Sequence, residues 1–96
     1  MKPSLILQTH RDNIRNIALR HNVVNVRVFG SVIHGNDTDS SDLDILVDPT
    51  SQTSMFDIAK IQVELTNFLG INVDVLTPRA LPDKFRNIVI SEALPL

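Results

Sequence analysis

Two short apolar segments each carry an aspartate near their middle, and this pattern limits how the chain can fold. Segment 43–48 contains Asp44, and segment 71–76 contains Asp74. Both segments are rich in Val, Ile and Leu and lead into a proline, which predicts β-strands that end there. Successive side chains of a strand point to opposite faces, so the residues flanking each aspartate point away from it. The pattern predicts a sheet with one apolar face and one face that bears carboxylates.

The remaining periodicity predicts one further strand and three longer helices. Segment 23–29 alternates Val24, Val26 and Val28 with polar residues, as a strand does. Apolar residues at helical spacing predict helices over about 5–21, over about 54–69 and from about Pro82. With a short turn or helix after the first strand, the order is α-β-α-β-α-β-α. We therefore expect an α+β fold, a small mixed β-sheet covered on one side by helices.

The helices also have predicted ends and buried faces. Ser54 is placed as an N-cap with Asp57 three residues later, and Gly70 as a left-handed C-cap. In chain order, the faces that we expect to be buried are Ile14, Ile17, Ala18 and His21, then Ile58, Ile61, Leu65, Phe68 and Leu69, then Phe85, Ile88 and Val89.

Composition narrows the class of protein. A chain of 96 residues with 43% hydrophobic residues is the size of one domain, 1–96. A net charge of -2, a pI near 5.8 and only four aromatic residues, all Phe, argue against direct nucleic-acid binding. The absence of cysteine excludes disulfides and thiolate metal sites and fits a cytoplasmic protein. No signal peptide or membrane span is expected.

The turn that follows the first strand is a candidate phosphate site. Gly30 and Ser31 come directly after the strand, and the turn ends at Gly35. A glycine there lets the backbone approach a ligand closely, and backbone amides with the Ser31 hydroxyl can bind phosphate oxygens. His34 lies in the same turn and can contact a phosphate. The pattern alone also fits an ordinary bend after a strand.

Three aspartates are candidate metal ligands. Asp42 and Asp44 are two residues apart on a strand, so both point to one face with Cα atoms ~6.6 Å apart. If the second and third strands are neighbours, Asp74 joins them there. Carboxylates arranged in this way can bind one hard cation or bridge two.

Structural explanations compete with this interpretation to different degrees. Asp42 could simply end the turn before its strand. Asp44 and Asp74 are harder to explain, because aspartate is disfavoured in the middle of a strand. A calcium loop starting at Asp37 is excluded, since its sixth position lacks glycine and a strand follows. His10 and His21 are typical of helix surfaces and ends.

Gly30-Ser31, ten intervening residues, Asp42-Leu43-Asp44 and the later Asp74 together resemble the DNA polymerase beta-like nucleotidyltransferase superfamily. Within it, the chain is similar to the minimal nucleotidyltransferases of prokaryotes over essentially all of its length. The resemblance implies that Asp42, Asp44 and Asp74 hold two Mg²⁺ ions, with Asp74 also helping to deprotonate the acceptor hydroxyl.

In the same resemblance, Gly30 and Ser31 hold the β- and γ-phosphates of a nucleoside triphosphate such as ATP. Some relatives carry Arg at the positions of Val32 and His34. Here Val32 offers no phosphate contact and His34 a weaker, pH-dependent one, which leaves the strength of catalysis open.

The resemblance also implies a partner. No second acceptor-binding segment is recognised, so we expect another protein to present the acceptor. Similar proteins are antitoxins of helical HEPN-domain toxins, and some transfer AMP to a toxin tyrosine. The chain contains no Tyr and cannot serve as its own tyrosine acceptor. Two alternatives remain: a non-catalytic module that neutralises a partner by binding, and a small-molecule nucleotidyltransferase that works as a homo-oligomer.

Overall fold

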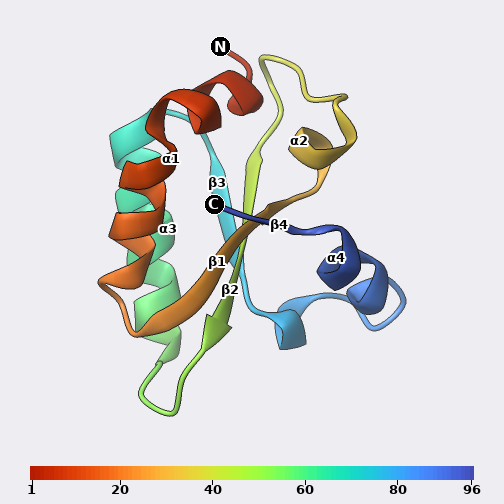
Figure 1. Cartoon of the computed structure of the whole chain (residues 1–96). Helices are drawn as coiled ribbons and strands as arrows, with labels where there is room; N and C mark the ends of the chain where they lie inside the picture. The colour runs from red at the N-terminus through yellow and green to blue at the C-terminus, as the bar shows by residue number, and fades with distance from the viewer.

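A four-stranded mixed sheet forms the centre of the computed structural model, which describes residues 1–96 (Figure 1). The strands are β1 (Val23–Phe29), β2 (Leu43–Pro49), β3 (Val73–Leu76) and β4 (Leu94–Pro95), in the order β3-β2-β1-β4. β1 is antiparallel to β2 and to β4, whereas β2 and β3 are parallel. The predicted α+β fold with a mixed sheet is confirmed. The sequence pattern did not reveal β4, which is only two residues long.

Two long helices cover one face of this sheet (Figure 1). They are α1 (Pro3–Leu19) and α3 (Met55–Leu69), and their side chains meet those of β1, β2 and β3 in one core. Ile14, Ile61 and Leu65 are completely buried, as expected. Phe68 was expected in this core but is 49% exposed, and its ring instead packs edge-on against His10. The core members are Leu7, Ile14, Ala18, Val23, Val26, Val28, Leu43, Ile45, Val47, Ile61, Leu65, Val73 and Val75.

The ends of α3 are as predicted. Ser54 and Asp57 form a reciprocal capping box, in which each side chain accepts a hydrogen bond from the backbone N–H of the other. Gly70 ends the helix at φ 71°, a conformation that favours glycine. No helix in the chain is both long enough and apolar enough to cross a membrane.

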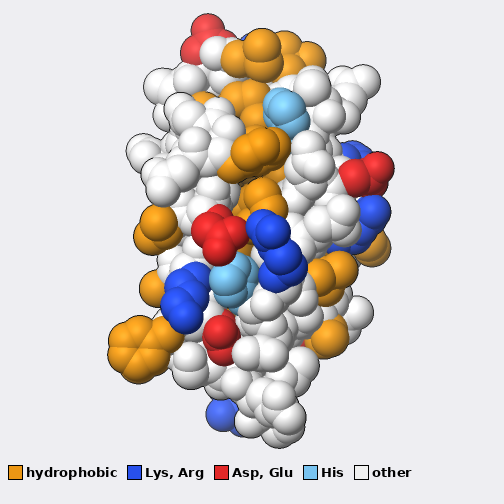
Figure 2. All heavy atoms as spheres, turned by 90° about the vertical axis from the view of Figure 1, so that its left-hand side faces the viewer, with side chains coloured by type: hydrophobic (Ala, Val, Ile, Leu, Met, Phe, Trp, Pro, Cys, Tyr) orange, Lys and Arg blue, Asp and Glu red, His pale blue; other side chains and the backbone are white.

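The outer surface of α1 and α3 carries charges of both signs among hydrophobic side chains (Figure 2). Glu64 of α3 contacts Arg20 at 3.2 Å and His21 at 2.8 Å. This group joins the end of α1 to the middle of α3. It lies on the helical side of the sheet.

The phase of β1 differs from the predicted alternation. Val23 is buried, whereas Val24 is 43% exposed. Asn25 has a φ of 54°, and the pairing with β2 shifts between Val24 and Arg27. This bulge adds one residue to the strand and reverses which side chains before it face the core.

The short helices lie on the other side of the sheet (Figure 1): α2 (Ser31–His34), the 3₁₀ helix η1 (Pro78–Ala80) and α4 (Arg86–Glu92). The expectation that Phe85 and Ile88 are buried was wrong, because they are 51% and 56% exposed. Pro82 to Phe85 form a turn, so α4 starts later and spans only seven residues before β4. A helix this short cannot bury a long row of apolar side chains along one face.

Candidate active site

Asp44 and Asp74 lie directly opposite each other in the parallel pairing of β2 with β3. Their flanking residues Leu43, Val73 and Val75 are buried in the core between sheet and helices. Because side chains alternate along a strand, the two aspartates project from the opposite face, away from α1 and α3. The neighbouring strands therefore bring together two carboxylates that are thirty positions apart in the sequence.

Asp44 is half-buried, whereas Asp42 and Asp74 are exposed. Desolvation, followed by the negative charges of Asp74 and Asp42, raises the pKa of Asp44 to about 6. The charges of Asp74 and Asp42 therefore both act on Asp44. No Lys, Arg or His side chain pairs with any of the three, so they concentrate negative charge on this part of the surface.

The three aspartates also differ from every other acidic residue in their contacts. None of their side chains makes a hydrogen bond or an ion pair. Each of the remaining acidic side chains has at least one such partner; these are Asp12, Asp37, Asp39, Asp48, Asp57, Glu64, Asp83 and Glu92. Like-charged carboxylates that converge without partners are suited to binding a cation.

The turn after β1 lies against this group. Gly30 has a φ of 79°, and a Cβ atom built on it would lie 2.3 Å from Oδ2 of Asp44. Only glycine allows the backbone to come so close to that carboxylate. The Ser31 side chain is partly buried and its hydroxyl has no hydrogen-bond partner in the protein. Ser31 is therefore free to donate a hydrogen bond to a ligand beside Asp44.

His34, the third predicted nucleotide contact, lies at the end of α2 and is exposed. Its Nε2 atom is 2.9 Å from Oε2 of Glu92 in α4. The imidazole is thus paired with a carboxylate of another element. Sequence reasoning did not identify Glu92, because no local pattern relates a residue near the chain end to this turn.

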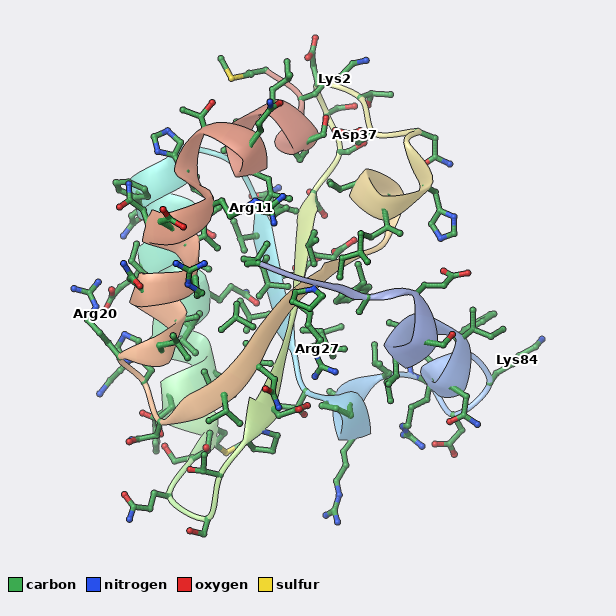
Figure 3. All side chains as sticks on the ribbon, in the orientation of Figure 1. Lys2, Arg11, Arg20, Arg27, Asp37 and Lys84 are labelled. Carbon is green, nitrogen blue, oxygen red and sulfur yellow. The ribbon has the colours of Figure 1, made fainter.

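A second residue that sequence reasoning missed is Asp37, in the loop that leads to Asp42. Its side chain is buried and accepts a hydrogen bond of 2.9 Å from the backbone N–H of Ser4. That bond holds the pKa of Asp37 below its ordinary value, with Lys2 nearby (Figure 3). The contact ties the loop that leads to Asp42 to the start of α1.

The donor set fits a hard divalent cation. All three candidate ligands are carboxylates, the ligand type that Mg²⁺ prefers. The side chains are not already drawn together into a cage of three or more ligands. The arrangement is an open carboxylate face beside a glycine turn, which leaves room for a ligand that brings its own oxygens, such as a phosphate.

Comparisons with known proteins identify the family of this chain. The family described as "Polymerase beta, Nucleotidyltransferase" matches residues 12–96. A candidate protein adenylyltransferase of Methanocaldococcus jannaschii is 33% identical over 81% of this chain and 84% of its own length. Protein adenylyltransferase MntA of Thermococcus cleftensis is 30% identical over 93% of this chain and 87% of its own length.

Solved structures share the fold. A candidate minimal nucleotidyltransferase superimposes with a TM-score of 0.85 at 36% identity, covering 97% of this chain and 95% of that one. A toxin–antitoxin structure with AMP-PNP has a TM-score of 0.68 at 22% identity, covering 88% of this chain and 70% of that one. By its sequence, its fold and its carboxylate face, this chain belongs to the polymerase beta-like nucleotidyltransferase family.

Proposed function

We propose that this enzyme transfers AMP from ATP to a hydroxyl group of a partner protein, and that Mg²⁺ bound by Asp42, Asp44 and Asp74 is required. The observation that carries the proposal is that Asp44, paired with Asp74 across β2 and β3, lies against Gly30 and is acted on by the negative charges of both Asp74 and Asp42. The names of the relatives, protein adenylyltransferases, support AMP as the transferred group.

Each residue has a distinct part in this reaction. The amides of the Gly30 turn and the Ser31 hydroxyl bind the β- and γ-phosphates. The three carboxylates would hold Mg²⁺, which would supply the positive charge that the triphosphate and the departing pyrophosphate need. Asp74, exposed at the edge strand, accepts the proton of the acceptor hydroxyl. The acceptor oxygen then bonds to the α-phosphorus, the bond to the β-phosphate oxygen breaks, and pyrophosphate leaves.

We propose that the acceptor belongs to a HEPN-domain toxin, for which the chain acts as the antitoxin in the cytoplasm. Related solved structures are toxin–antitoxin assemblies, one of them MntA with its toxin. The candidate site is an open face, and none of the hollows on the surface is lined by its three aspartates. An open face suits an acceptor that is presented by another protein.

The test uses the purified chain, ATP labelled at the α-phosphate, Mg²⁺ and the HEPN protein encoded beside it. We expect label on the partner, and none after Asp42→Asn with Asp44→Asn. Label that persists in this double variant contradicts the assigned site. If the double variant still neutralises the toxin fully, binding alone provides the protection and catalysis is dispensable.

A further inference from the structure

One ion pair links the candidate phosphate turn to the C-terminal part of the chain. Nε2 of His34, at the end of α2, lies 2.9 Å from Oε2 of Glu92, near the end of α4. His34 is the only basic residue between Gly30 and Gly35. The turn that would receive a triphosphate thus has one basic side chain, the His34 imidazole, and the Glu92 carboxylate contacts it.

The position of this carboxylate matters because the expected ligand is an anion. A triphosphate brings several negative charges to the Gly30 turn, and Glu92 adds another beside it. The side chains of His34 and Glu92 are 52% and 41% exposed, so water screens their attraction and the pair is weak. A bound phosphate can therefore compete with Glu92 for the imidazole.

Glu92 is not needed to hold α4 in place. Three backbone carbonyls, of Pro78, Arg79 and Leu81, accept hydrogen bonds from Arg86 at the start of α4. Beyond the helix, β4 pairs with β1, and the Leu96 N–H donates to Val26 O. Both ends of α4 are anchored independently, which leaves the contact with His34 free to serve another purpose.

We propose that Glu92 is a positioning residue that holds the His34 imidazole away from the phosphate site and so weakens nucleotide binding. Replacing Glu92 by a neutral residue would release the His34 imidazole toward the triphosphate. The effect acts through His34, in addition to the simple loss of one negative charge. This inference rests on the proposed function, since it needs a triphosphate at the Gly30 turn.

The experiment measures ATP–Mg²⁺ binding by titration calorimetry in the wild type, Glu92→Gln, His34→Gln and the double variant. We expect Glu92→Gln to tighten ATP binding roughly two- to fivefold, the size of an exposed ion-pair effect, and most of this gain in affinity to disappear when His34 is also replaced. The control is Glu64→Gln, because Glu64 also contacts a histidine Nε2, that of His21 at 2.8 Å, but lies on the helical side of the sheet. It should leave ATP affinity unchanged.

Each outcome separates the hypotheses. Unchanged affinity in Glu92→Gln overturns the inference while the proposed function stands. An equal gain in ATP affinity with and without His34 would show that only the loss of a negative charge matters, and would also overturn the positioning role. A lower melting temperature in Glu92→Gln without tighter binding would assign Glu92 to structure alone. If the wild type binds no ATP–Mg²⁺, the proposed function fails and the inference fails with it.

Discussion

Asp44 faces Asp74 across two parallel strands, and its carboxyl group has a pKa raised to about 6 by desolvation and by the charges of Asp74 and Asp42. The ordinary value is 3.8, so the folded state holds this proton more tightly than the unfolded state. The protonated Asp44 carboxyl contributes its full share to the stability of the fold below pH 3.8, and this contribution is lost as the pH rises through about 6. At neutral pH the metal-free site therefore opposes folding.

Asp44→Asn should thus stabilise the metal-free protein at pH 7.5 and have little effect at pH 4. The carboxyl is only half-buried, so solvent screening reduces the gain to roughly 1–2 kcal/mol. Thermal unfolding in EDTA at the two pH values measures the difference. An equal gain in stability at both pH values would show that the charge of Asp44 does not cause the gain.

Gly30 is expected to tolerate no side chain. In Gly30→Ala, the Cβ would lie 2.3 Å from Asp44 Oδ2 at a φ of 79°. Backbone strain and the displaced carboxylate should cost about 1–3 kcal/mol of stability, together with most of the nucleotidyl transfer. Urea unfolding and ATP turnover measure the two effects.

Gly35→Ala is the matched control for that prediction. Gly35 also has a positive φ, 70°, but a Cβ there would meet nothing within 4 Å. The Gly35→Ala variant should lose about 1 kcal/mol of stability because of backbone strain, and it should keep its activity. Equal loss of activity in both variants would mean that backbone strain, and not closeness to Asp44, explains the need for Gly30.

How far the sequence predicts this molecule depends on the distance over which each signal acts. The capping box of Ser54 and the Gly70 C-cap were predicted correctly, since both involve residues close in the chain. The meeting of Asp44 and Asp74 followed once the two strands were assumed to be neighbours. The site assignments themselves stay predictions.

The errors arose where a local pattern was overridden or was too short to detect. The bulge at Asn25 moved Val24 out of the core, and a positive φ at Asn leaves little trace in a run of valines. Phe85 and Ile88 have helical spacing, yet the turn before α4 leaves them exposed. The Glu92 contact with His34 is non-local and has no sequence signal.

Asp74→Asn should reduce the rate of nucleotidyl transfer by about a hundredfold or more, because this carboxylate is assigned both to Mg²⁺ and to the acceptor proton. Asp74 is exposed and unpaired and its charge repels that of Asp44, so the variant should be no less stable than the wild type. Asp83→Asn is the control, since Asp83 is also exposed but pairs with Arg86 at 2.7 Å. Single-turnover transfer measures both variants. A rate near that of the wild type in Asp74→Asn would remove Asp74 from the reaction.

Arg86 should be irreplaceable by lysine although both residues are cationic. Its guanidinium donates hydrogen bonds to the carbonyl oxygens of Pro78, Arg79 and Leu81, and it pairs with Asp83. A lysine ammonium cannot reach these acceptors in the same plane, so Arg86→Lys should lose about 1–3 kcal/mol as carbonyls lose partners. Arg79→Lys is the control, because the Arg79 side chain is exposed and makes no hydrogen bond or ion pair. Urea unfolding should separate the two variants; equal stability would show that water replaces the Arg86 contacts and that α4 is held by β4 alone.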